Sequence, residues 1–391
     1  MKRKIVYCIP SLYNSRGMER VISIKANYLA SLSNYEVIII VTDGREKPPF
    51  FELHPDISVI NLGINYDDLY HSSLLERATG YFQKRKQYKS RLSEALHRIK
   101  PDITISLLRR DIDFISTIKD GSIKLGEFHF CRPNYRNFTE SSIPKFLQKT
   151  ISAWWMKQLV GSLKKLHKFI VLTGEDKDNW HELDNVAVIG NPLSFMPETA
   201  STCTSKEFIA VGALFAEKRF DSLINCWAKV VKRHPEWILR IYGEGMLRGD
   251  LQTLINEHGI TNNCILEGPT NDILSKYAAS SCSVLTSKNE GFPMVIIEAM
   301  SCGLPVVSYT CPCGPRDIIN DGIDGFLVEN GNEAQLVEKI CAIIDNEETR
   351  KKMGENARHN VQRFSVENIG RKWEELFDEV LSDHKNQRSH K

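Results

Sequence analysis

Short apolar runs alternate along the chain with longer segments in which apolar residues recur every three or four positions. Buried strands produce the first pattern and amphipathic helices the second, so their alternation is typical of βαβ units built around a parallel sheet. The first helical segment shows the pattern clearly, because Met18, Val21, Ile22 and Leu29 form one apolar stripe. The sequence therefore predicts an α/β fold.

The alternation of strands and helices runs through the chain twice. The predicted strands of the first series are residues 4–9, 36–41, 103–107, 123–127 and 169–172. After an aperiodic stretch rich in Pro, Ser and Thr at 197–206, the second series comprises residues 207–211, 238–242, 264–266, 282–286, 305–308 and 326–328. We expect two doubly wound domains, at residues 1–190 and 191–365, with a ligand cleft at the carboxyl ends of their strands. A last helix at about 366–385 is expected to pack back on the first domain.

Charge and composition place the chain among ordinary globular proteins. Of its 391 residues 42% are hydrophobic and 26% charged, which is enough to form a sizeable core. The 51 Lys and Arg residues nearly balance the 49 Asp and Glu residues, giving a net charge of +2. Such a balance does not suit a protein that neutralises a nucleic-acid backbone, so we expect no nucleic-acid partner.

Apolar runs and cysteines bear on the cellular compartment. No stretch approaches the ~18 consecutive apolar residues of a membrane span, and the apolar part of the first residues is too short for a signal peptide. Several of the 10 cysteines are scattered singly within apolar elements, as in proteins of a reducing compartment. Cys311 and Cys313 lack the second ligand pair of a zinc motif. We therefore expect a cytoplasmic protein without structural zinc.

A pair of glutamates marks the strongest candidate site. Glu290 precedes the turn Gly291-Phe292-Pro293, and Glu298 lies about one turn inside the helix that follows. The free N–H groups and the positive dipole end of this helix favour sugar hydroxyl oxygens or phosphate. Two carboxylates placed in this way can hold two parts of one extended ligand, although they could also merely solvate the helix.

The run EGFPMVIIEAMSCGLPVV at 290–307 resembles the donor-site signature of the large bacterial retaining glycosyltransferase family of GT-B fold, the family 4 type. The resemblance covers almost the whole chain and implies two Rossmann-like domains facing a central cleft. It implies that Glu290 faces the donor sugar and that Glu298 holds the ribose hydroxyls of a nucleotide. Gly291, Phe292 and Pro293 then form the turn whose backbone approaches the sugar.

A second loop opens the C-terminal half, where Val211-Gly212 leads into cations at the start of a helix. A diphosphate there would gain an ion pair and helix-end N–H groups. Lys218 matches the phosphate-binding lysine of the family and is a catalytic candidate. The family usually has Arg where this chain has Ala213, and we expect Arg219 to supply the missing cation. A solvated charge at a helix start is the alternative interpretation of Lys218.

Two further segments resemble the donor site of the family. Gly243-Glu244-Gly245 forms a strand-to-helix junction like the G-x-G segment beside the nucleotide base, a weak signal when it stands alone. Glu267 follows the next strand and resembles the base-binding edge. The resemblance thus adds Gly243, Glu244 and Glu267 to the donor-binding candidates.

The N-terminal half contributes a loop and a histidine. Arg16 and Gly17 lie in a loop that resembles the family's G-G-x-E loop, with Arg16 in place of the first Gly. Gly17 keeps the position of close backbone approach. Arg16 could contact phosphate or an acidic acceptor, or could point to solvent. A lone His is more often structural than catalytic, but His129 follows a predicted strand where the family has a His near the donor sugar, and the resemblance makes it the third catalytic candidate.

No metal site is expected. Asp111-Ile112-Asp113 spells D-x-D, the metal motif of the other major glycosyltransferase fold. It opens a predicted helix in the half without the nucleotide signature, so we interpret Asp111 as a helix cap. Nothing else resembles a Mg or Mn cage, and the reaction should need no metal cofactor.

Two basic segments, 83–98 and 145–168, carry aromatic residues that include Trp154 and Trp155. They are consistent with contact to an anionic membrane surface or with a solvated face over buried Trp.

The sequence predicts an enzyme that moves a hexose-type sugar from a nucleotide diphosphate donor, a UDP-sugar on the resemblance, to a hydroxyl. The acceptor would be a growing, lipid-linked surface polysaccharide such as capsule or lipopolysaccharide, at the cytoplasmic face of the membrane. Retention of configuration comes from the resemblance alone. The alternatives are a UDP-sugar 2-epimerase of the same fold and a non-catalytic sugar-nucleotide-binding protein.

Overall fold

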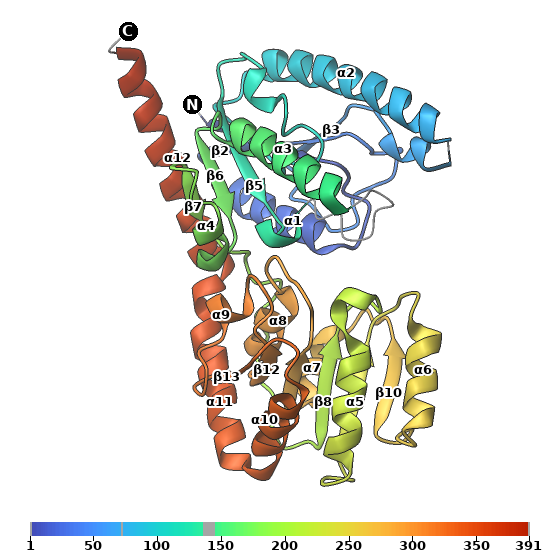
Figure 1. Cartoon of the computed structure of the whole chain (residues 1–391). Coiled ribbons are helices and arrows are strands. Elements are labelled where there is room, and N and C mark those ends of the chain that lie inside the picture. Colours follow the sequence, from blue (N-terminus) through green and yellow to red (C-terminus); the bar gives the residue numbers. More distant parts are fainter. Residues whose placement is uncertain (1, 72, 136–144, 390–391) are drawn as a thin grey trace. The chain divides into compact units, whose positions relative to one another are not determined.

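The chain divides into two compact units in the computed structural model, which describes residues 2–71, 73–135 and 145–389 (Figure 1). The N-terminal unit comprises Met1–Leu172, Lys177–Pro192 and Val366–Lys391. The C-terminal unit comprises Thr173–Asp176 and Leu193–Ser365. Each unit is built around its own parallel sheet.

The sheet of the N-terminal unit has the strand order β3-β2-β1-β4-β5-β6-β7, and all neighbours are parallel. Its strands are β1 (Arg3–Ile9), β2 (Tyr35–Val41), β3 (Ser58–Asn61), β4 (Ile103–Ser106), β5 (Ile123–Phe128), β6 (Lys168–Val171) and β7 (Val186–Val188). The five predicted strands are confirmed, whereas β3 and β7 were not predicted. The strand order reverses between β1 and β4, which is the position where such folds bind ligands.

Helices cover the N-terminal sheet, and their apolar faces form its core. They are α1 (Gly17–Ser31), α2 (Leu74–Ile99), α3 (Lys145–Leu163) and α12 (Val366–Ser389), with 3-10 turns η1 (Tyr66–His71), η2 (Ile115–Thr117) and η3 (Arg132–Asn134). The short helix α4 (Gly174–Asn179) is shared, because its residues up to Asp176 belong to the C-terminal unit and the rest to the N-terminal unit. The last helix packs against α1, where the Tyr28 hydroxyl donates to Glu374 at 2.9 Å. The C-terminal end of the chain thus completes the N-terminal unit.

The sheet of the C-terminal unit has the order β10-β9-β8-β11-β12-β13 and is also parallel. Its strands are β8 (Glu207–Val211), β9 (Ile238–Tyr242), β10 (Cys264–Gly268), β11 (Cys282–Leu285), β12 (Val306–Tyr309) and β13 (Gly325–Val328). All six were predicted, each starting within one residue of its observed start. The loops after β8, β9 and β11, which carry Lys218, the Gly243-Glu244 segment and Glu290, lie at the carboxyl edge of this sheet.

The helices of the C-terminal unit connect these strands and enclose a core centred on the fully buried Trp227. They are α5 (Phe220–Val231), α6 (Arg248–Glu257), α7 (Ile273–Ala279), α8 (Met294–Ser301), α9 (Pro315–Ile318), α10 (Glu333–Asp345) and α11 (Glu347–Asn360), with 3-10 turns η4 (Ala216–Lys218) and η5 (Val361–Phe364). The Trp227 indole N–H donates to the Asn263 carbonyl at 2.7 Å, which satisfies its one polar atom. Among the described residues, no helix is both long and apolar enough to cross a membrane.

Candidate active site

The helix α8 begins directly after the turn that carries the first glutamate. Pro293 is its N-cap, with φ −73° and ψ 91°, so the helix starts one residue later than a proline in the first helical position would imply. Phe292 is buried and packs edge-on against Phe364, with ring centroids 5.4 Å apart. This packing holds the Phe292 side chain in the interior and fixes the turn.

Two predicted catalytic residues are brought together in the C-terminal unit. The Lys218 Nζ lies 2.6 Å from Glu290 Oε1, and the two side chains are 25% and 12% exposed. The loops that carry them are tied by backbone contacts as well. The Thr286 hydroxyl donates to the Lys218 carbonyl at 3.0 Å, and the Lys288 N–H donates to the Glu217 carbonyl at 2.7 Å.

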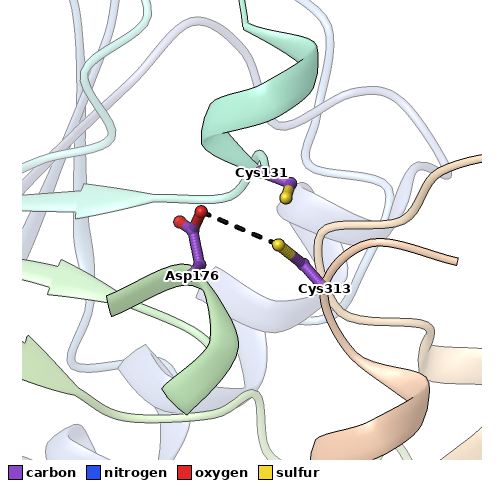
Figure 2. A group of neighbouring side chains, drawn as sticks. All are labelled: Cys131, Asp176 and Cys313. Carbon is purple, nitrogen blue, oxygen red and sulfur yellow. Dashed lines mark hydrogen bonds between the residues drawn. The ribbon is translucent and has the colours of Figure 1, made fainter. Parts of the chain in front are cut away.

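The loop after β12 contacts this turn through a backbone hydrogen bond. The Glu290 N–H donates to the Pro312 carbonyl at 3.4 Å. Figure 2 shows the next residue of this loop, Cys313, whose Sγ lies 3.7 Å from Asp176 Oδ1. Asp317 Oδ1 accepts the Gly174 N–H at 2.6 Å. Hydrogen bonds therefore link the segment after β12 both to the turn at Glu290 and to the start of α4.

The second glutamate of the pair is buried inside the first turns of α8. Glu298 is 4% exposed, and its Oε1 accepts a hydrogen bond from the Ser194 hydroxyl at 2.8 Å. An ionised carboxylate at such a position needs donors, because burial without them is costly. Neighbouring hydroxyl groups can supply those donors.

Arg219 and Lys218 are adjacent in sequence but have different neighbours. Arg219 adopts a left-handed backbone with φ +50°. Its guanidinium carbon lies 5.5 Å from the centroid of the Tyr309 ring, and its nitrogens lie beside Gly331. Ala213 is exposed and carries no cation. Lys218 is therefore the cation that contacts Glu290.

The glycines of the G-x-G segment have a packing reason. Gly243 has φ +148°, and a Cβ there would overlap the Gly212 carbonyl oxygen, while a Cβ at Gly245 would overlap the Leu214 backbone. The Leu214 N–H donates to the Glu244 carbonyl at 2.9 Å, so the loops after β8 and β9 lie directly against each other. Only glycine fits such a close approach.

Glu267 lies on β10 and forms an ion pair with Arg240 of β9. The same guanidinium reaches Glu207 of β8 at 2.9 Å. The Glu267 carboxylate thus takes part in a cross-strand charge network, and the adjacent Gly268 carbonyl accepts the Gly243 N–H at 3.0 Å. The base-binding edge expected here would be formed by this backbone.

The start of α1 carries the glutamate of the segment that resembles the family's G-G-x-E loop, Glu19, which the sequence analysis did not single out as a site residue. Gly17 begins α1, and no atom would lie within 4 Å of a Cβ there, while Arg16 is exposed. Glu19 is 4% exposed, its Oε1 lies 3.5 Å from the Ser11 hydroxyl, and its Oε2 has no hydrogen-bond partner in the described part of the chain. The signal for it was the glutamate position of that motif, which falls in the first turn of α1.

His129 lies beside a buried ion pair. Its Nε2 lies 3.0 Å from Glu127 Oε1, and Glu127 also pairs with Lys25 of α1. Burial alone would raise the pKa of Glu127, but Lys25 and His129 together lower it to about 2. Sequence reasoning missed Lys25 and Glu127, although Lys25 falls on the apolar stripe of α1 where a charge is unusual.

The expected role of Asp111 as a helix cap is wrong. Asp111 is 2% exposed and accepts a hydrogen bond from the Tyr88 hydroxyl at 3.3 Å, while the short 3-10 turn η2 begins four residues later. Asp113 instead lies 3.5 Å from Arg85. The two carboxylates have different partners, and burial raises the pKa of Asp111 to about 6.

Replacing Asp111 by asparagine should stabilise the protein at pH 8 by about 1 to 2 kcal/mol. Because the folded-state pKa is raised, ionisation of Asp111 costs stability above pH 6, and this cost disappears as the pH falls toward 4. The asparagine side chain would carry no charge at either pH. Urea unfolding of wild type and Asp111→Asn at pH 8 and at pH 4 measures the change in the free energy of unfolding. An equal change at both pH values would contradict the raised pKa of Asp111.

Comparison with known proteins identifies the family of the chain. The family model for group 1 glycosyl transferases matches residues 195–360. An uncharacterised glycosyltransferase of Haemophilus influenzae is 28% identical over 376 residues, covering 95% of this chain and 99% of its own. The amylovoran biosynthesis glycosyltransferase AmsD of Erwinia amylovora is 30% identical over 240 residues, covering 59% and 67%.

A third relative, from Campylobacter jejuni, is 28% identical over 383 residues, covering 96% of this chain and 99% of its own. Its name describes an α-1,4-N-acetyl-D-galactosaminyltransferase acting on a GalNAc-containing diNAcBac-PP-undecaprenol.

Solved structures share the fold. A variant of S. aureus TarM in complex with fondaparinux, alpha-GlcNAc-glycerol and UDP has a TM-score of 0.74 at 17% identity, covering 96% of this chain and 100% of that one. HepE of Anabaena in complex with UDP has a TM-score of 0.73 at 15% identity, covering 97% and 100%. With two parallel sheets of seven and six strands, the chain has the GT-B fold. It belongs to the group 1 glycosyltransferase family and is a transferase enzyme.

Proposed function

We propose that the enzyme is a retaining, family 4 type hexosyltransferase that moves a sugar from a UDP-sugar to a hydroxyl of a lipid-linked surface polysaccharide. One observation carries the proposal: Lys218 and Glu290 meet at 2.6 Å beside the start of α8, and Glu298 lies one to two turns inside that helix. A cation, a carboxylate for the sugar and a carboxylate for the ribose hydroxyls thereby follow one another along one edge of the sheet.

The chemistry is electrostatic. As the bond between the sugar and the diphosphate breaks, negative charge grows on the leaving phosphate, and Lys218 is placed to stabilise it. The departing phosphate can then accept the proton of the attacking hydroxyl. Glu290 positions the sugar, while Glu298 accepts hydrogen bonds from the ribose hydroxyls.

The choice of UDP and of a lipid-linked acceptor rests on relatives. TarM and HepE were solved with UDP, and the Campylobacter jejuni relative is named for an undecaprenol-linked substrate. In the N-terminal unit, Phe82 and Trp154 are 67% and 55% exposed on the basic helices α2 and α3. Exposed aromatic rings among lysines suit contact with an anionic cytoplasmic membrane surface.

Incubating the enzyme with a panel of nucleotide sugars tests the proposal. Release of UDP from one UDP-sugar, saturating with donor concentration and accelerated by an undecaprenol-linked saccharide, is the expected result. An epimerised sugar formed without acceptor would favour the 2-epimerase instead. Binding without release of nucleotide would favour a sugar-nucleotide-binding protein.

Sugar transfer should continue in excess EDTA with less than about a twofold change in rate. The expectation follows from the site chemistry, because Lys218 rather than a divalent cation neutralises the leaving phosphate. The assay compares initial rates with EDTA, with Mg²⁺ and with Mn²⁺. Loss of activity in EDTA that Mn²⁺ restores would contradict the proposal.

A further inference from the structure

Arginines gather at the carboxyl edge of the N-terminal sheet, and most of them are neutralised. The loops after β2, β4 and β5 carry Arg45, Arg110 and Arg132. Each is paired: Arg45 with Asp68 at 3.0 Å, Arg110 with Asp43, and Arg132 with Glu182 at 2.5 Å. Their charges are thus compensated within the protein.

Two arginines at the same edge are not neutralised. Arg16 follows β1 and Arg109 follows β4, and both are exposed. In the described part of the chain, neither side chain forms an ion pair or a hydrogen bond. The Arg109 guanidinium carbon instead lies 4.6 Å from the centroid of the Phe130 ring, which holds the planar group in place.

The surroundings of Arg109 leave positive charge uncompensated. Neighbouring groups displace water from the Arg109 guanidinium, and this desolvation lowers its pKa. The positive charges of Arg110 and Arg16 lower the pKa further. Tyr135 and Glu19 oppose the shift. A guanidinium with free donors beside a second cation is suited to bidentate binding of an anion.

We propose that Arg109, with Arg16, binds a phosphate group of the acceptor. Two cations match the charge of a phosphate monoester or diphosphate, which is about −1.5 to −2 for a monoester at neutral pH. The stacked guanidinium presents its donors in a fixed plane, and the loop position after β4 places them at the ligand-binding edge of the sheet. This inference rests on the proposed transfer to a phosphate-bearing, lipid-linked acceptor.

The donor's own diphosphate is the other source of the same chemistry, so the test separates the two. Inorganic pyrophosphate is titrated by calorimetry into the full-length enzyme while UDP is kept at saturation, so that the donor site is filled. The proteins are wild type, Arg109→Ala, Arg109→Lys and the matched control Arg45→Ala, whose arginine lies at the same edge but is paired. UDP affinity is measured separately for each.

Wild type and Arg45→Ala should bind pyrophosphate within about twofold of each other. Arg109→Ala should bind about 10-fold more weakly, the scale of losing a charge-assisted bidentate contact, with Arg109→Lys between them. UDP affinity should be unchanged in all four. Equal pyrophosphate affinity in Arg109→Ala, or no binding by wild type, overturns the proposal. Weakened UDP binding in Arg109→Ala assigns the arginine to the donor instead and also overturns it. Absence of UDP binding by wild type would refute the proposed donor. In that case, titration of pyrophosphate into wild type and Arg109→Ala without UDP would still test the role of Arg109.

Discussion

Replacing Lys218 by alanine is expected to slow sugar transfer by about 100- to 1000-fold, the scale of removing one electrostatic stabiliser of a developing charge. UDP-sugar binding should weaken far less, because the charge that Lys218 meets is largest in the transition state. The ammonium lies 2.6 Å from Glu290 and is 25% exposed, so it remains accessible to a phosphate. Turnover and donor affinity, measured separately, give the comparison.

Arg219→Ala provides the matched control, because it removes the adjacent cation. Its guanidinium lies over Tyr309, so we expect a smaller loss of the same kind. Combining it with Ala213→Arg, which restores the cation typical of the family, should recover turnover if Arg219 acts on phosphate. A silent Arg219→Ala would leave Lys218 as the phosphate cation, and a Lys218→Ala variant with unchanged turnover would contradict the mechanism.

Glu290→Gln is expected to have opposite effects on UDP binding and on turnover, and it thereby distinguishes the role of Glu290 from that of Lys218. Removing the carboxylate frees Lys218 from its partner, so UDP should bind a few-fold more tightly. Turnover should still fall, because the sugar loses its positioning carboxylate. Weaker UDP binding in this variant would mean that the pair does not compete with the diphosphate.

Glu298→Ala is expected to weaken UDP binding by about 1 to 3 kcal/mol, the scale of hydrogen bonds to a charged group. The carboxylate is 4% exposed and accepts a hydrogen bond from Ser194 at 2.8 Å. Ser194→Ala is the control, since it disturbs the same pocket without removing the charge, and it should cost less. Thermal unfolding of both variants verifies that the fold is intact.

The strands of both sheets could be predicted because buried parallel strands form continuous apolar runs. The missed strands lack that signal: β3 (Ser58–Asn61) is largely exposed, and β7 (Val186–Val188) has three residues. Parallel pairing with a neighbouring strand, which no local pattern encodes, places them in the sheet.

Sequence motifs identified the candidate site residues, but they did not predict which of these residues contact one another. Lys218 and Glu290 are 72 positions apart, and the 2.6 Å contact between them depends on how the loops after β8 and β11 meet. The left-handed backbone of Arg219, which turns it toward Tyr309, was equally invisible. Lys25 and Glu127 are 102 positions apart, so the sequence did not predict their contact. The place of Lys25 on the apolar stripe of α1 nevertheless indicated a buried charge that needs a partner.

Calorimetry with two nucleotides tests most directly whether the C-terminal unit binds the donor through its ribose at Glu298. Wild type and Glu298→Ala are each titrated with UDP and with 2′,3′-dideoxyuridine diphosphate, which lacks the ribose hydroxyls. Wild type should prefer UDP by about the factor that Glu298→Ala loses, and Glu298→Ala should bind both nucleotides equally. If Glu298→Ala weakens both nucleotides by the same factor and keeps the preference for UDP, Glu298 does not hold the ribose.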